Sequence, residues 1–576
     1  MGKRTKNTSQ MKRISEHVML ATLASSIVMT PMFATKASAL NINASSALLQ
    51  TKEIVNLTQS VSILESKGWL ESANVEWHPV EGATGYNVYY KSENDSDSEY
   101  KKIDDKLIRQ YQSYFRADIV GISEGSYVIK IVPIINNKEA SEDEAVTKAI
   151  NVKSHTREGF AFSSESPMGT GSGGYNNDGT VADNAQIVYI TAQNINSVTA
   201  DVITNKKGTK TTCTGLVDIL AKRQKGYDKN PLIIRMVGEI KSSDINGLNG
   251  NGYLQLKGCY NVTFEGVGED ATAYGWGFLI RDAHNVELRN VGVMLFPDDG
   301  ISLDTDNENI WVHNNDIFYG SAGSDKDQVK GDGSSDVKKS DYVTVSYNHY
   351  YDSGKCSLCG MGDSEDFHVT YHHNWFDHSD SRHPRIRVGT VHIYNNYFDG
   401  NSKYGVGVTK GSSAFVEANY FRNCKYPMLA SLQGTDIYSD PEGTFSGENG
   451  GMIKAFNNKI DGAKRLVYAN EDSTQFDAYL ATTRSEVVPS SYKTLAGGTT
   501  YNNFDVSSAM YDYAPDAPEN VENNVTTYAG RVNGGDFAWN FTPEDDTSDT
   551  VNNELMNKIR NYKSDLISVG GKLLDK

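Results

Sequence analysis

Cysteine is scarce in this chain, with only 5 in 576 residues, which excludes a small fold held together by disulfides. Proline is also scarce, at 13 residues, so collagen-like and proline-rich classes are excluded. The formal net charge of −18 argues against a protein that binds nucleic acid through an overall basic surface. Beyond the N-terminal region, no apolar run approaches the about 18 residues that a membrane-spanning helix needs.

The N-terminus has the pattern of a secretory signal peptide. A basic start is followed by a mostly apolar stretch over 18–34, and Ala37-Ser38-Ala39 fits a small-x-small cleavage site. We therefore expect residues 1–39 to be removed. The mature protein is expected to be secreted and extracellular, not attached to a membrane, and monomeric. A membrane anchor is the alternative, but polar residues interrupt the apolar stretch.

The region 70–155 predicts a small antiparallel β-sandwich. Apolar and polar residues alternate there in short runs rich in aromatic residues, such as 86–91, and glycines separate the runs. The stretch 77–90 resembles a fibronectin type III module, and we expect a spacer or substrate-proximity role in preference to a dedicated carbohydrate-binding site. An N-terminal segment, 40–69, precedes this module. The Gly- and Ser-rich segment 156–182 is interpreted as a linker or a strand leading into the next domain.

The pattern changes in the remaining region, 183–576, where short β-type runs recur. Most of these runs end in asparagine, at Asn290, Asn315, Asn348, Asn374, Asn396, Asn419 and Asn458. Most steps between these residues are 22–26 residues long, with two longer steps of 33 and 39. A period of this length without helices between the runs predicts an all-β fold, a right-handed parallel β-helix. The repeated asparagines are expected to stack, because each amide can donate to and accept from the next coil.

Two helices are expected outside the coils. In the segment 215–223, Leu216, Ile219 and Leu220 share one helical face and Gly226 follows, so we expect a cap over the N-terminal end of the solenoid. A second helix is expected over 554–559, on the outside of the solenoid or on its far end.

Two acidic segments suggest a site for a hard divalent cation. Asp298 and Asp299 lie in one, and Asp332 and Asp336 lie in the other, about one coil later. Residues one coil apart stack on the same face of a β-helix, and carboxylates gathered there would repel each other. Ca²⁺ prefers such carboxylate oxygens and would relieve the repulsion. The alternative is that these aspartates only shape surface turns rich in Gly and Ser.

A third segment, 381–387, concentrates positive charge. Arg385 and Arg387 share one face if the segment is extended, and Arg382 precedes Pro384. By themselves these arginines are equally compatible with solvated surface charges.

Together with neighbouring runs, these segments form an ordered set. The set is Asp-Gly-Ile-Ser at 299–302, Asn-Ile-Trp-Val at 309–312, Asp-x-x-x-Asp at 332–336, Ser-Asp-Tyr-Val-Thr-Val-Ser at 340–346, Lys-x-x-x-x-Gly at 355–360, Val-Thr-Tyr-His-His-Asn at 369–374 and Arg-x-Pro-Arg-x-Arg at 382–387. This set resembles the pectate lyases of polysaccharide lyase family 1, over roughly 185–470. The family fold is a right-handed parallel β-helix, in agreement with the repeat.

The resemblance implies a secreted, calcium-dependent lyase that cleaves α-1,4-polygalacturonate (pectate) by β-elimination and leaves 4,5-unsaturated oligogalacturonates. The implied site residues are Asp299, Asp332 and Asp336 as Ca²⁺ ligands with Asp298 as a fourth, Arg382 as catalytic base, and Lys355 and Arg387 as contacts to substrate carboxylates. Because a guanidinium accepts a proton only when it is neutral, we expect an alkaline pH optimum.

One departure from the family pattern is visible. The family continues Trp-x-Asp-His, whereas here His313-Asn314 follows Trp311-Val312. That position is structural in the family, so the expected activity is unchanged. Three alternative functions are compatible with this fold: a pectin lyase acting on methylated substrate without calcium, a non-catalytic pectin-binding β-helix, and a glycoside hydrolase, which would need a pair of catalytic carboxylates.

Overall fold

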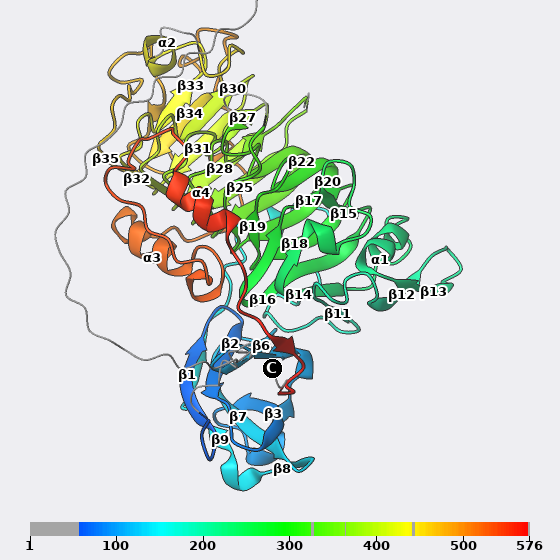
Figure 1. Cartoon of the computed structure of the whole chain (residues 1–576). Coiled ribbons are helices and arrows are strands. Elements are labelled where there is room, and N and C mark those ends of the chain that lie inside the picture. The colour runs from blue at the N-terminus through cyan, green and yellow to red at the C-terminus, as the bar shows by residue number, and fades with distance from the viewer. Residues whose placement is uncertain (1–56, 324–327, 363–364, 440–443, 574–576) are drawn as a thin grey trace, which may run out of the picture. The chain divides into compact units, whose positions relative to one another are not determined.

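The computed structural model describes residues 57–323, 328–362, 365–439 and 444–573 (Figure 1). The expected signal peptide therefore lies outside the described residues. None of the described helices is long and apolar enough to cross a membrane. All five cysteines are described, are buried and form no disulfide.

Two antiparallel sheets form the N-terminal module and share one core that contains Trp77, Tyr86 and Ile129. The first sheet has the order β1-β2-β6-β5-β37, from β1 (Ser62–Gly68), β2 (Ser72–His78), β5 (Ile108–Gln110), β6 (Phe115–Val120) and β37 (Ser568–Val569). The second is built from β3 (Ala83–Ser92), β4 (Lys101–Lys102), β7 (Gly125–Ile135), β8 (Lys138–Glu139), β9 (Ala145–Val146) and β10 (Ile150–Val152). The predicted antiparallel sandwich is confirmed, and its likeness to a fibronectin module stays a prediction.

The module is extended by a strand from the other end of the chain. Strand β37 pairs antiparallel with β5, with Ser568 opposite Gln110. On the side of the solenoid, the buried Arg109 donates to the carbonyl oxygen of Val267 at 2.7 Å. The C-terminal residues thus belong structurally to the N-terminal sandwich.

A single 24-stranded sheet winds into a parallel β-helix, which confirms the predicted fold class. Its pairings define three stacks of strands (Figure 1). The first, called the groove stack below, contains β15 (Tyr253–Lys257), β17 (Gly277–Arg281), the first part of β20 (Ile301–His313), the first part of β22 (Ser335–Ser346), β24 (Leu358–Cys359), β27 (Arg385–Arg387), β30 (Val406–Thr409) and β33 (Met428–Ala430).

The other two stacks complete each coil. The second contains β11 (Gln186–Ile190), the first parts of β14 (Leu232–Lys241) and β16 (Tyr260–Tyr274), β18 (His284–Arg289), the last parts of β20 and β22, β25 (His368–His372), β28 (Thr390–Tyr394), β31 (Ser413–Glu417), β34 (Met452–Phe456) and β36 (Tyr479–Leu480). The third contains the last parts of β14 and β16, β19 (Gly292–Met294), β21 (Asp316–Ile317), β23 (His349–Tyr351), β26 (Trp375–Asp377), β29 (Tyr397–Asp399), β32 (Tyr420–Arg422) and β35 (Lys459–Asp461).

Apolar side chains from all three stacks fill the interior, and an asparagine ladder, buried from Asn315 to Asn419, crosses the coils. Each side-chain amide donates to the next side-chain oxygen at 2.9–3.1 Å, in the order Asn315, Asn348, Asn374, Asn396, Asn419 and Asn458. The predicted stacking is therefore confirmed for six of the seven residues. It was wrong for Asn290, because Val291 takes the ladder position in that coil. Asn290 occupies the preceding position and has a left-handed backbone (φ 57°).

Both expected helices are present. Helix α1 (Leu216–Arg223) follows the hairpin of β12 (Thr199–Ile203) and β13 (Lys210–Thr214) and buries its apolar face in the core of the first coils. Helix α4 (Asn553–Arg560) packs Leu555 and Ile559 on the outside of the solenoid, against Phe318 and Tyr319. Two further helices, α2 (Thr435–Ser439) and α3 (Val521–Tyr528), were not anticipated.

The segment 156–182, interpreted above as a linker or leading strand, lies against the second stack. The backbone N–H groups of Phe160 and Gly174 donate to the hydroxyls of Thr370 (3.1 Å) and Thr263 (2.9 Å). Thr263 and Thr370 belong to strands several coils apart, so the segment runs along the stack. Threonine hydroxyls on the outer face of the sheet thus satisfy backbone donors that would otherwise be buried without partners.

Candidate active site

The candidate site lies on the loops that enter the groove stack (Figure 1). Backbone hydrogen bonds continue from coil to coil through these loops. The N–H groups of Gly300, Ser334 and Ser357 donate to the carbonyl oxygens of Gly333, Lys355 and Arg382, at 2.8–2.9 Å. Residues that are 20 to 50 positions apart in the sequence therefore become neighbours. Asp298, Asp299, Asp332, Lys355 and Arg382 come from this row of loops. Asp336 lies near the start of β22, and Arg387 ends β27.

Three carboxylates converge at one end of the row. Asp298, Asp299 and Asp332 each offer an oxygen atom within 4.8 Å of the others. The side-chain amide of Asn251 donates to Asp298 Oδ2 at 2.7 Å, and Asp299 is buried. Burial, together with the negative charges of Asp299 and Asp332, raises the pKa of Asp298. Asp298 thus lies close enough to the other two carboxylates for their charge to affect its protonation.

Asp336 lies beside this group on the strand that follows. The backbone N–H of Leu358 donates to its Oδ1 at 2.9 Å, and burial, followed by the charge of Asp299, raises the pKa of Asp336 to about 7. Lys338 places its Nζ 2.7 Å from Asp299 Oδ2 and 3.7 Å from Asp336 Oδ2. Lys338 was missed from the sequence, although its position two residues after Asp336 puts both on one face of the strand.

The three predicted cations differ in how they are held. Lys355 Nζ lies 3.2 Å from Asp332 Oδ1, and Arg387 Nε lies 2.6 Å from Glu448 Oε2. Arg382 is half-buried, and within the described part of the chain its guanidinium makes no hydrogen bond or ion pair. Its backbone is left-handed, with φ 65°. Arg382 is therefore the cation best placed to contact a ligand directly.

Lys355 and Arg382 line a pocket of about 550 Å³ that continues along the next loops. The sequence did not point to Lys403 and Lys425, which also line it. A signal existed, because both lysines precede a tyrosine and lie about one coil apart, as Lys403-Tyr404 and Lys425-Tyr426. Cations and aromatic rings predominate in the pocket lining, which also contains Asp436 and Asp549, so the pocket can bind anionic groups.

The departure at His313-Asn314 lies in a buried structural network. His313 Nε2 is 3.0 Å from Glu287 Oε1, and its ring stacks on Trp311. Asn314 Nδ2 donates to the carbonyl oxygen of Tyr528 at 2.7 Å, beyond the end of the second stack. These contacts are with the wall of the solenoid and its C-terminal segment, and none is with the acidic group.

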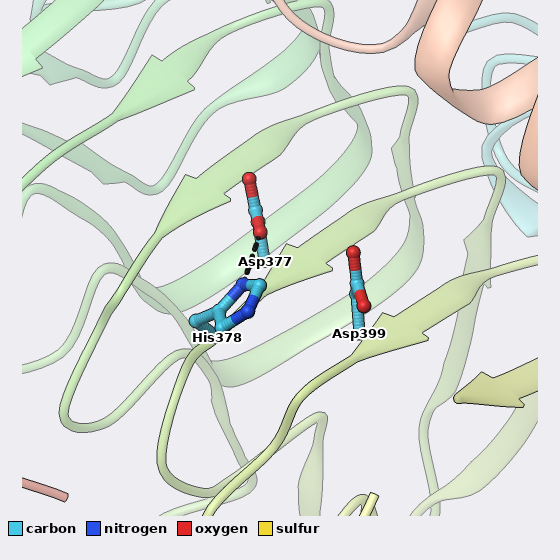
Figure 2. A group of neighbouring side chains, drawn as sticks. All are labelled: Asp377, His378 and Asp399. Atoms are coloured by element: carbon cyan, nitrogen blue, oxygen red, sulfur yellow. Dashed lines mark hydrogen bonds and ion pairs between the residues drawn. The ribbon is translucent and has the colours of Figure 1, made fainter. Parts of the chain in front are cut away.

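A second cluster, on the third stack, was not anticipated. Asp377 and Asp399 stack in register on β26 and β29, and Figure 2 shows them pointing the same way with the His378 ring against Asp377. His378 Nδ1 is 2.6 Å from Asp377 Oδ1, and its Nε2 is 3.1 Å from Asp546 Oδ1. Asp399 pairs with Arg422, which also binds Asp546. Since every member already has a charged partner, this cluster is a latch that holds the C-terminal segment.

Comparison with known proteins identifies the family. The sequence model of the pectate lyase family matches residues 162–533, which is more than half of the chain. The chain therefore belongs to the pectate lyase family and is a polysaccharide lyase.

Curated relatives agree with this assignment. A pectate trisaccharide-lyase from Bacillus licheniformis is 34% identical over 236 residues, which is 40% of this chain and 67% of that protein. Pectate lyase 3 from Pectobacterium carotovorum is 28% identical over 273 residues, 46% of this chain and 66% of that protein. Among solved structures, a pectate lyase from Bacillus sp. N165 in complex with trigalacturonate is 22% identical, with a TM-score of 0.45 over 65% of this chain and 99% of that one.

Proposed function

We propose that this chain is a secreted, calcium-dependent pectate lyase that cleaves α-1,4-polygalacturonate by β-elimination and leaves 4,5-unsaturated oligogalacturonates. One observation carries this proposal: a converging group of carboxylates lies on the same row of loops as Arg382, whose guanidinium has no hydrogen-bond or ion-pair partner among the described residues, and further cations line that groove. The proposal of secretion depends on the leader pattern in residues 1–39.

The donor set fits calcium. Asp298, Asp299 and Asp332 are all oxygen donors, without histidine or cysteine among them, and Ca²⁺ prefers such ligands. The raised pKa values of Asp298 and Asp336 reflect burial and repulsion from neighbouring carboxylates, which the charge of Lys338 only partly offsets. Asp336 is adjacent and can complete the set. Bound here, Ca²⁺ would supply the positive charge that makes the proton at C5 of a coordinated uronate acidic.

The side chains of this protein then have distinct tasks. Arg382, whose guanidinium has no hydrogen-bond or ion-pair partner among the described residues, accepts the proton from C5. The C4–O bond then breaks and a C4–C5 double bond forms. The departing glycosidic oxygen takes up one proton, which the protonated Arg382 can return, so no water is consumed. Lys355 and Arg387 bind uronate carboxylates next to the reacting sugar. Arg387 can do so while it pairs with Glu448, because a guanidinium has five N–H donors.

Ultraviolet absorbance tests the proposal, because the double bond is conjugated with the uronate carboxylate. Polygalacturonate and methylated pectin are each incubated at alkaline pH with the mature protein, with calcium or with excess chelator. We expect absorbance to rise on polygalacturonate only, to stop with chelator, and to fall about 100-fold or more in Arg382→Ala.

Three results would contradict the proposal. New reducing ends without absorbance would mean hydrolysis. Absorbance that survives the chelator, or that is stronger on methylated pectin, would remove calcium from the mechanism. Full activity of Arg382→Ala would remove the assigned base.

A further inference from the structure

A buried cluster of three charged side chains lies beneath the candidate groove. Lys330 Nζ is 2.5 Å from Asp352 Oδ1 and 2.7 Å from Asp380 Oδ1. The three side chains are 1%, 6% and 4% exposed, respectively. The ammonium has three donors, so it can serve both carboxylates at once. These residues are called the loop triad below.

Each member of the loop triad sits on the same loop as one residue of the proposed site. The pairs are Lys330 with Asp332, Asp352 with Lys355, and Asp380 with Arg382. The spacing within each pair is only two or three residues, so the placement of the buried member constrains the placement of its partner. The triad therefore links the loops of the metal group, of the carboxylate-binding lysine and of the base.

Burying these charges destabilises the folded protein unless all three side chains are present. Removing one partner of a buried ion pair leaves an uncompensated charge, whereas a well-packed apolar set of similar volume is often as stable as the intact pair. Stability alone thus does not explain three charges at this place. What the charges add is short and directional contacts between successive loops.

The backbone next to Arg382 needs such support. A left-handed arginine is strained, and such strain persists only where the surroundings determine the conformation. Asp380 is fixed through its backbone, since its N–H donates to Ser353 O at 2.7 Å and its carbonyl oxygen accepts from Lys403 N at 2.9 Å. The Ser402 hydroxyl also donates to Asp380 Oδ1 at 2.9 Å.

We propose that Lys330, Asp352 and Asp380 are positioning residues that set the relative placement of Asp332, Lys355 and Arg382 for the lyase reaction. None of the three reaches the substrate, and each acts through the loop that carries it. This inference rests on the function proposed above.

Asp380→Asn tests the proposal because it keeps the shape of the side chain and removes its charge. We expect kcat at saturating calcium and substrate to fall about 100-fold, since small displacements of reacting groups have effects of this size, with KM within about threefold. Hydrogen exchange at the amides of 332–334, 355–357 and 381–383 should become faster. The triple variant Lys330→Met, Asp352→Asn, Asp380→Asn, which leaves no buried charge, should show the same loss of kcat if any single variant folds poorly.

A matched control exists elsewhere in the solenoid. Lys454 and Asp505 form another buried pair, with Nζ 2.6 Å from Oδ2 and both side chains 0% exposed. Lys454→Met with Asp505→Asn should change the thermal midpoint as the triad variants do, and should leave kcat and exchange in the three loops unchanged.

The outcomes separate this inference from the function it rests on. Unchanged exchange in the three loops of Asp380→Asn would overturn the triad, whether or not the wild-type protein is a lyase. Faster exchange there in a wild-type background without lyase activity would support the linkage of the loops and contradict the proposed function. Equal losses of kcat in the triad variants and in the control would show a merely structural role and overturn the proposal.

Discussion

The ammonium of Lys338 lies 2.7 Å from Asp299 Oδ2, within the acidic group that we assign to calcium. A cation that binds Asp299 must share this carboxylate with the lysine or displace it. Positive charge so close weakens the binding of a second cation.

The first prediction is that Lys338→Met binds calcium more tightly. Without substrate, we expect the calcium dissociation constant to fall about tenfold, which corresponds to about 1.4 kcal/mol. Isothermal titration calorimetry measures it. The matched control is Lys339→Met, which removes the same charge from the exposed neighbouring residue and should change little. Weaker calcium binding in Lys338→Met would contradict the assignment of Asp299 as a ligand.

The second prediction concerns the latch around His378 and the dependence of stability on pH. Burial lowers the pKa of His378, but its hydrogen bond to Asp377 and the nearby carboxylates outweigh burial and raise that pKa above 6.5. The stabilisation of the folded state by protonated His378 is therefore complete below pH 6.5 and is lost as the pH rises through the raised pKa. Burial and Asp377 raise the pKa of Asp399 to about 6, so the stabilisation from its protonated form is lost between about pH 4 and pH 6, below the range in which His378 titrates.

Thermal unfolding at pH 5 to 9 tests this prediction. We expect the thermal midpoint of the wild type to decrease over this range and the decrease to be smaller in His378→Gln. His284→Gln, in which the replaced histidine pairs with Glu308 at the surface, serves as control and should follow the wild type. Parallel curves for the wild type and His378→Gln would contradict a protonated latch.

The third prediction concerns the asparagine ladder. Asn374→Ala removes the oxygen that accepts from the backbone N–H and the side-chain amide of Asn348, and it removes one of the two donors to Asn396 Oδ1. We expect a loss of about 1–3 kcal/mol, the typical cost of a buried polar group without a partner, and hence a lower thermal midpoint. Asn523→Ala, at an exposed position on α3, should change stability by less than about 0.5 kcal/mol. Equal effects of the two variants would mean that the ladder adds nothing.

The fourth prediction concerns the cations farther along the groove. Lys425→Met should raise KM for long polygalacturonate about threefold to tenfold with kcat nearly unchanged, because the lysine binds substrate away from the reacting bond. The effect should shrink at high salt, which screens surface charges. Lys464→Met removes a cation near the same Tyr426 ring but outside the pocket lining, and should leave KM unaltered. A fall in kcat with constant KM would place Lys425 in the chemistry instead.

The repeat was readable from the sequence because a solenoid buries the same positions in every coil. Buried apolar residues and asparagines therefore recur at a regular spacing in the sequence. Helices α1 and α4 were predictable because their apolar residues follow a helical period outside that repeat. The aspartates, Lys355 and the arginines were visible through motif resemblance. The structure then placed them on successive loops of one groove.

Contacts between coils were decided by the tertiary structure. Lys338 next to Asp299, the loop triad, the Lys403 and Lys425 row, and the pairing of β37 with β5 all join residues whose separation depends on the lengths of intervening loops. A periodic pattern specifies which side chains point inward within one coil. It does not specify which charged side chain meets which across coils, because that depends on the register of whole loops and on the burial that only the assembled solenoid creates.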